Sequence, residues 1–202
     1  MRNTIRGLAA AGAVMMFLTA CASATHEDAH DKTVLYYADY PSYNDLRELA
    51  AGANLIVEGT VTGTPRILKQ AADAPSGTDP QLNPQAGAPA GAQPAPEPMI
   101  STVHTFQISK VFKGKATTGQ SIEVKEIGGV LDGVTYKNAD ATPLAAGTKY
   151  TLFLQTYPDS PASLLNPQQG KYPVDAAGNL SALPGNPVQV ARADLEKLAT
   201  TK

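Results

Sequence analysis

Two alternating stretches decide the fold: ISTVHTFQISKVF at residues 100–112 and QSIEVKEI at residues 120–127. Alternation of apolar and polar side chains predicts β-strands that bury one face. His104 and Ile108 share the apolar phase of the first stretch, and the phase then shifts to Val111. Such a shift indicates a β-bulge, so we expect this strand to bend.

Three further stretches complete the predicted sheet. Residues 54–64 (NLIVEGTVTGT) are rich in β-branched side chains, residues 149–156 (KYTLFLQT) form an apolar run, and residues 170–175 make a weaker fifth strand. Residues 113–119 have the composition of a hairpin turn. Five short strands predict a mainly β fold, namely a small five-stranded antiparallel OB-like barrel, with a β-sandwich as the alternative.

One or two short helices should flank this barrel. Ser42 and Asp45 have the spacing of a capping-box variant, and Gly52 is a natural stop. Between them, an apolar stripe at helical spacing consists of Leu46, Leu49 and Ala50. A second helix is expected around residues 190–198.

A proline-rich segment at residues 65–98 separates the first two predicted strands. It holds eight of the chain's 16 prolines, together with many alanines and glycines. Because proline lacks a backbone donor and fixes φ, we expect a disordered insert rather than a strand or a long helix. Too little chain precedes it to form a separate core, so residues 33–202 should make one domain around this insert.

The N-terminus has the features of an export signal. A short basic start precedes the apolar, uncharged residues 7–18, a run too short to span a bilayer. The following Leu18-Thr19-Ala20-Cys21 resembles the lipobox of bacterial lipoprotein precursors, which implies that residues 1–20 are removed and that Cys21 is lipidated. Residues 21–32 would then be a tether. The alternative is an ordinary secretory signal with a chance cysteine.

Composition narrows the class of protein further. The chain of 202 residues has one cysteine, which excludes an intrachain disulfide, and its net charge is −2. Loss of Arg2 and Arg6 with the signal segment would make this charge −4. An acidic exported domain has no general attraction for nucleic acid, and the small basic cluster near residues 110–115 reads as a hairpin tip.

The sequence offers few groups for catalysis. His104 is the one histidine in the predicted folded part, and it is interpreted as a half-buried structural residue rather than a catalytic base. Glu123 and Lys125 alternate on the polar face of their strand and read as a solvated pair. Gly128 and Gly129 read as turn residues, because no helix pattern follows them. We therefore predict a protein that is not an enzyme and needs no cofactor.

Metal binding has one weak candidate. His26 and His30 are spaced for one face of a helix and have acidic neighbours. They lie in the predicted tether, which offers no rigid scaffold or supporting shell of hydrogen bonds. We expect a solvated spacer, and we predict no metal site.

A tyrosine-rich segment at residues 33–43 precedes the first helix. Its four tyrosines can either pack across the domain or present an aromatic surface to a partner. The residues proposed for such a contact are Tyr36, Tyr37, Tyr40 and Tyr43.

The motifs together resemble a known family. DLRELAAGANLIVEGTVTG at 45–63, TVHTFQISKVFKGK at 102–115 and PLAAGTKYTLFL at 143–154 are similar to uncharacterised exported bacterial lipoproteins. Their barrel resembles the OB-like N-terminal domain of tissue inhibitors of metalloproteinases. The resemblance covers most of residues 45–183 and implies the fold. The inhibitory mechanism does not transfer, because a lipidated Cys21 has no free amine to bind a target's metal.

We therefore expect a lipid-anchored protein on the extracytoplasmic face of a cell membrane. Its domain is predicted to be a non-catalytic binding or structural module for an envelope or extracellular protein, with no nucleic-acid partner. One alternative is an inhibitor that blocks an extracellular protease through its barrel loops. A second is an enzyme, which would require His104 to lie beside a cleft.

Overall fold

The computed structural model describes residues 32–71, 98–139 and 141–200, all within one compact unit of the chain. The predicted signal segment, nearly all of the tether and most of the insert lie outside the described residues. Two helices and eight strands occur in the described parts. They are β1 (Lys32–Tyr36), α1 (Leu46–Gly52), β2 (Leu55–Gln70), β3 (Met99–Lys113), β4 (Ser121–Leu131), β5 (Val134–Asn138), β6 (Lys149–Tyr157), β7 (Ser160–Leu164), β8 (Lys171–Pro173) and α2 (Arg192–Thr200).

Five of these strands close into a ring. The order is β2–β3–β4–β7–β6, with β6 returning to β2. All of these pairings are antiparallel except β4 with β7, which run parallel. The ring confirms a small, barrel-like, mainly β fold rather than the sandwich. The prediction of uniformly antiparallel strands was wrong for this one seam.

The fifth strand of the ring is β7, which the sequence pattern did not indicate. The predicted fifth strand at 170–175 appears as β8, which pairs only with the first half of β6 and is not part of the ring. The β7 sequence SPASL contains small side chains and a proline, so it lacks the β-branched and aromatic residues that mark a strand.

Strand β2 continues beyond its predicted end into the proline-rich segment. Residues up to Gln70 pair with the start of β3, so the prediction that no strand continues past Pro65 is wrong. Pro65 falls in a register shift between Thr62 and Arg66, so its missing N–H interrupts no ladder bond. Here β3 pairs with β2 on one side and, up to Ser101, with β4 on the other, so only the last residues of β2 pair with β3 alone.

Strand β4 also runs past its predicted end. Gly128 and Gly129 are strand residues, not turn residues, and both have positive φ, 115° and 143°. A Cβ on Gly129 would lie 2.7 Å from Thr102 Oγ1 and 2.8 Å from the side chain of Ile67, so only glycine fits. Here β4 leaves β3 and pairs with β5.

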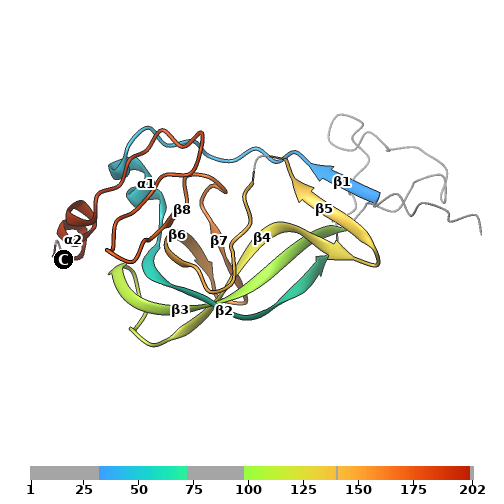
Figure 1. Ribbon diagram of the computed structural model, residues 1–202, viewed down its shortest axis with the longest axis horizontal. Coiled ribbons are helices and arrows are strands. Elements are labelled where there is room, and N and C mark those ends of the chain that lie inside the picture. The colour runs from blue at the N-terminus through green and yellow to red at the C-terminus, as the bar shows by residue number, and fades with distance from the viewer. Residues whose placement is uncertain (1–31, 72–97, 140, 201–202) are drawn as a thin grey trace, which may run out of the picture. The chain divides into compact units, whose positions relative to one another are not determined.

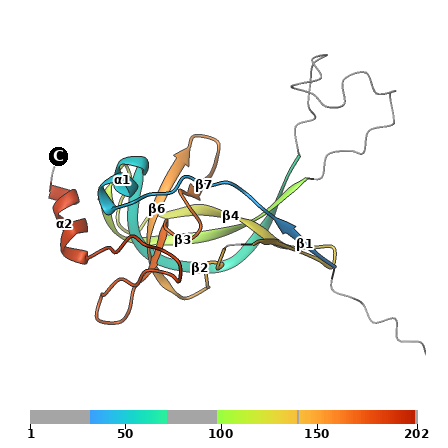
Figure 2. The same cartoon turned by 90° about the horizontal axis from the view of Figure 1, so that it is seen from above.

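Strand β1 pairs in parallel with β5 at the end of the sheet. We call β1, β5 and the part of β4 paired with β5 the wing. Figure 1 and Figure 2 show the wing at one end of the β domain and the two helices at the other.

The barrel has two apolar cores. The first fills its interior and includes Phe106, Val124 and Leu152. The second lies between the outside of the barrel and the helices, and includes Leu49 and Leu195. Burial of these two residues explains why short helices are stable here, since packing outweighs their weak intrinsic stability.

Helix α1 begins three residues later than a cap at Ser42 would place it. Asp45 is the N-cap, and its carboxylate accepts the N–H of Glu48 at 2.9 Å. Glu48 in return accepts the N–H of Asn44, the residue before the N-cap, so the arrangement is a variant of the capping box. The predicted stop at Gly52 is confirmed. Within the described residues, no helix has both the length and the apolar character needed to cross a membrane.

Candidate functional site

A buried ion pair lies at one end of the barrel. Lys171 Nζ lies 2.5 Å from Glu126 Oε1, and their side chains are 1% and 9% exposed. His104 Nε2 lies 3.4 Å from the other carboxylate oxygen, Oε2, and this side chain is 7% exposed. The three residues come from β3, β4 and β8, so only the folded sheet brings them together.

The ion pair also holds the loop that follows β5. Glu126 Oε2 accepts the N–H of Leu144 at 2.7 Å, and Lys171 donates to the carbonyl of Thr142. Leu144 itself is buried in the barrel core. The Glu126–Lys171 pair thus holds the loop over the barrel end. The carboxylate and the ammonium group of the pair both have hydrogen-bond partners, as buried charged groups require.

The charge of Glu126 is stabilised in spite of its burial. Burial acts to raise the pKa of this carboxyl, but His104, Lys171 and the N–H of Leu144 outweigh it and hold the pKa below its ordinary value. Glu126 is therefore a carboxylate at neutral pH. Since it stays ionised and accepts hydrogen bonds from Lys171 and the N–H of Leu144, it is poorly suited to act as a general acid.

His104 is the unsatisfied member of this group. Its Nε2 is buried, lies 3.4 Å from Glu126 Oε2 and makes no hydrogen bond within the described residues, so it acts on Glu126 by proximity alone. No described hydroxyl bonds to this nitrogen, so the pairing of nucleophile and base needed for covalent catalysis is not present there.

A cavity opens where β4 and β7 part. These strands pair only at Val124 with Ala162 and at Lys125 with Ser163. Beyond that point a cavity of about 220 Å³ lies between them, which is room for about seven waters at ~30 Å³ each. We call it the seam cavity. Its polar lining residues are Tyr40, Gln70, Ser101, Lys125, Glu126, Asn138 and Ser163.

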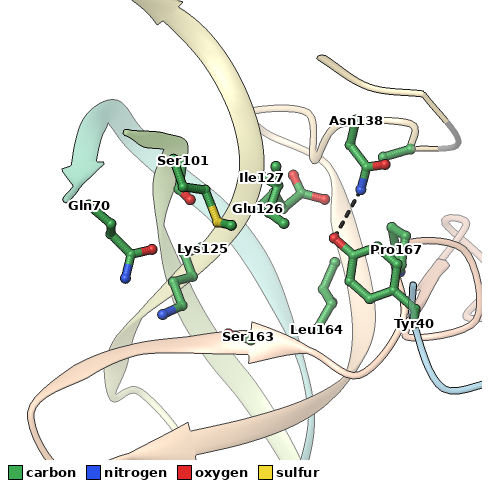
Figure 3. A pocket seen from close by; sticks show the side chains of 12 residues that line it. Tyr40, Gln70, Ser101, Lys125, Glu126, Ile127, Asn138, Ser163, Leu164 and Pro167 are labelled. Atoms are coloured by element: carbon green, nitrogen blue, oxygen red, sulfur yellow. Dashed lines mark hydrogen bonds between the residues drawn. The ribbon is translucent and has the colours of Figure 1, made fainter. Parts of the chain in front are cut away.

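The polar groups of the seam cavity come from two sides. Gln70 and Lys125 lie on one side, Tyr40 and Asn138 on the other, and Glu126 between them (Figure 3). Asn138 Nδ2 donates to Tyr40 Oη at 2.9 Å. Burial raises the pKa of Tyr40, so this phenol stays protonated and neutral.

Lys125 is the cation of the seam cavity that lacks a carboxylate partner in the described parts of the chain. Its Nζ donates to Ser160 Oγ at 3.0 Å and lies 5.3 Å from the centre of the Tyr157 ring. Lys125 forms no ion pair among the described residues, whereas the sequence pattern predicts that it forms a solvated pair with Glu123. Glu123 instead binds Arg66 through two hydrogen bonds of 2.9 and 2.7 Å.

A second cavity of about 440 Å³ shares Glu126 and lies against the wing. We call it the groove. Its lining is mainly apolar and includes Leu35, Val130 and Pro143, with His104 among the polar members. Glu126 thus lies between two cavities, both with a mainly apolar lining, and the seam cavity carries several polar groups at its edges.

His104 was correctly placed in a strand and in phase with its buried neighbours. It is fully buried rather than half-buried, since only 6% of the residue is exposed. It also lies beside a cavity and a carboxylate, which is the arrangement that the enzymatic alternative required.

Three of the four predicted contact tyrosines pack against the domain. Tyr36 stacks on Tyr136 at 5.8 Å between ring centres, and its hydroxyl donates to the carbonyl of Pro98. Tyr40 bonds Asn138 as above, and Tyr43 packs on the helix core. Tyr37 is the exception, with 79% of its surface exposed.

Several predicted residues lie outside the described parts of the chain. They are Cys21 and the weak metal candidates His26 and His30. In the described ranges, no three His, Cys, Asp or Glu side chains gather closely enough to hold a metal ion.

Glu126 and Lys171 were missed by the sequence reasoning. Glu126 shares the phase of Ile122 and Val124, so a carboxylate on the apolar face of this strand was a usable signal. Lys171 gave no such signal. Its neighbour in sequence, Tyr172, is also buried, so this short strand shows no alternation of buried and exposed residues.

Comparison with protein-family models, curated proteins and solved structures finds no match for this chain. The resemblance to exported lipoproteins and to the inhibitor-like barrel therefore stays a prediction from the sequence motifs.

Proposed function

We propose that this chain is a lipid-anchored protein of the cell envelope whose β domain binds a protein partner without catalysis. The lipobox-like residues ending at Cys21 support the anchor. The observation that carries the binding role is the seam cavity, a mainly apolar cavity with a few converging polar groups that opens where β4 and β7 part. Pockets that combine shaped walls with a few converging polar groups are typical of binding sites.

The chemistry of the seam cavity indicates what it binds. Lys125 has no carboxylate partner among the described residues, and the amides of Gln70 and Asn138 supply further donors nearby. Glu126 adds no free negative charge, because Lys171 compensates it. A partner side chain that ends in a carboxylate or amide oxygen fits this set of donors.

Site-specific photo-cross-linking tests this proposal. A photoreactive residue would replace Gln70, which lines the seam cavity, in the full chain produced with its own leader in bacterial cells. The matched control replaces Gln107, an exposed glutamine on β3 away from the cavity. We expect one discrete adduct from position 70, no such adduct from position 107, and loss of the adduct with Lys125→Met.

The proposal fails if position 70 of a folded, exported chain gives no adduct. It also fails if the adduct survives Lys125→Met, since binding would then not depend on the cation of the seam cavity.

An enzymatic role is the second candidate, favoured by His104 beside Glu126 at the edge of the groove. It is tested by comparing the wild type with His104→Gln on simple ester and peptide substrates. Turnover that disappears in this variant, while the fold is retained, would replace the binding proposal.

A further inference from the structure

The wing carries the most exposed large apolar side chains in the described chain. Tyr37 is 79% exposed, Val130 is 60% and Leu35 is 50%, whereas the other exposed large apolar residues reach at most 45%. We call these three residues the wing surface. Large apolar side chains that are exposed to water and gather in one region indicate an interaction site.

Strand register places two of the three on one face. Thr33 and Val130 are both partners of Thr135, and Leu35, two residues after Thr33, therefore shares their face. Lys137 is the partner of Leu35 and adds a cation to the same face. Tyr37 follows Leu35 by two residues and is the first residue after β1, directly beside the wing.

The chain outside the described residues indicates the occupant. Ten residues lie between Cys21 and Lys32, the first residue of β1, and even a fully extended chain over this interval spans only about 40 Å. An anchor at Cys21 would therefore keep the wing close to the bilayer and raise its effective concentration there. The helices lie at the opposite end of the β domain (Figure 2).

The composition of the wing surface matches that of a membrane interface. Tyrosine is enriched where a protein meets lipid headgroups, aliphatic side chains enter the acyl boundary, and lysine reaches the phosphates. We propose that the wing surface contacts the lipid bilayer that holds the anchor. This inference rests on the proposed lipidation of Cys21.

The lack of tryptophan in the chain permits a clean test. Tyr37→Trp introduces one reporter on the wing surface, and Tyr157→Trp introduces one on the β6–β7 turn as the matched control. Each full, processed lipoprotein is reconstituted into phosphatidylcholine–phosphatidylglycerol vesicles with and without brominated acyl chains. We expect bromine to quench residue 37 at least about twofold more than residue 157, as contact with lipid requires.

A second pair of variants separates lipid contact from mere proximity. Leu35→Lys and Val130→Lys, each made in the Tyr37→Trp background, should reduce the quenching towards that of the control. Mass spectrometry of each sample establishes acylation first, and its absence would refute the anchor. Equal quenching at positions 37 and 157 in an acylated chain would overturn the inference alone. Shielding of residue 37 from iodide without bromine quenching would also overturn it, and would indicate a protein contact.

Discussion

Two buried carboxylates, Glu58 and Glu126, show how the same chemistry serves different ends in this barrel. Glu58 is 4% exposed and pairs with Lys149 at 2.7 Å and Arg192 at 2.5 Å. These cations are 41% and 29% exposed. Glu126 is paired with Lys171, which is almost completely buried, and it lies between two cavities.

The difference lies in what each pair connects. Arg192 is the first residue of α2 and also donates to the carbonyl of Gly178 at 2.6 Å, so the Glu58 cluster fastens the C-terminal helix to the barrel. The Glu126 cluster fastens a loop and leaves His104 unsatisfied beside open space. Because Lys149 and Arg192 are partly exposed, water can solvate them if Glu58 is lost. In a fully buried ion pair, loss of one member leaves the other charge without compensation.

Lys171→Met should have the largest effect on stability. It leaves the carboxylate of Glu126 buried without its cation, so we expect a loss of about 3–5 kcal/mol in the free energy of unfolding. Chemical denaturation at pH 7 measures this loss. The control is Glu126→Gln combined with Lys171→Met, which should recover much of it. A loss below about 1 kcal/mol in the single variant would show that the pair is effectively hydrated.

Glu58→Gln should cost less, about 1–3 kcal/mol, because Lys149 and Arg192 can turn to water when their partner is lost. The expected local result is faster amide exchange in Arg192–Thr200, with the barrel strands unchanged. Equal or greater damage than from Lys171→Met would reverse the proposed ranking of the two clusters.

Acid should weaken both clusters. Burial acts to raise the pKa of Glu58, but Lys149 and Arg192 outweigh it, so the pKa values of Glu58 and Glu126 both lie below the ordinary value. The unfolded chain then binds protons at higher pH than the folded one. Stability is therefore full above the ordinary glutamate pKa of about 4.3 and is lost as pH falls through the lowered values.

The measurement for this prediction is the free energy of unfolding from pH 7 to pH 2. Glu58→Gln and Glu126→Gln should each give a shallower decline than the wild type. A decline of unchanged steepness in Glu126→Gln would mean that this carboxyl does not titrate differently in the folded and unfolded states.

Arg66→Gln should have the smallest effect. The Arg66–Glu123 pair has good geometry, but its side chains are 49% and 48% exposed. Pairs that stay in water contribute little to folding, so we expect a melting temperature within the scatter of the wild type. A clear drop would show that the end of β2 depends on this contact.

The sequence carried enough signal for the barrel and its cores. Alternation marked the apolar faces of β3 and β4, and the run at 149–156 marked the central strand β6. It failed at β7 and at the ends of β2 and β4. Those segments are held by pairing with distant strands rather than by their own propensity.

The candidate site was only partly accessible from sequence. The sequence pattern placed His104 in a strand, in phase with its apolar neighbours. The phase of Glu126 was a usable signal that this carboxylate lies on the apolar face of its strand. Lys171 reaches Glu126 only because β8 pairs with β6, at Lys171 opposite Leu152, on the side of the barrel where β4 and β7 part. Contacts set by long-range pairing leave no local pattern to read.

The measurement that tests the central claim most directly is the intact mass of the processed chain extracted from cell membranes. Partner binding at an envelope surface and bilayer contact by the wing both require the anchor. We expect a chain that begins at Cys21 and carries the added mass of a diacylglycerol group. A chain that still begins at Met1, or that carries an unmodified thiol at Cys21, would contradict it.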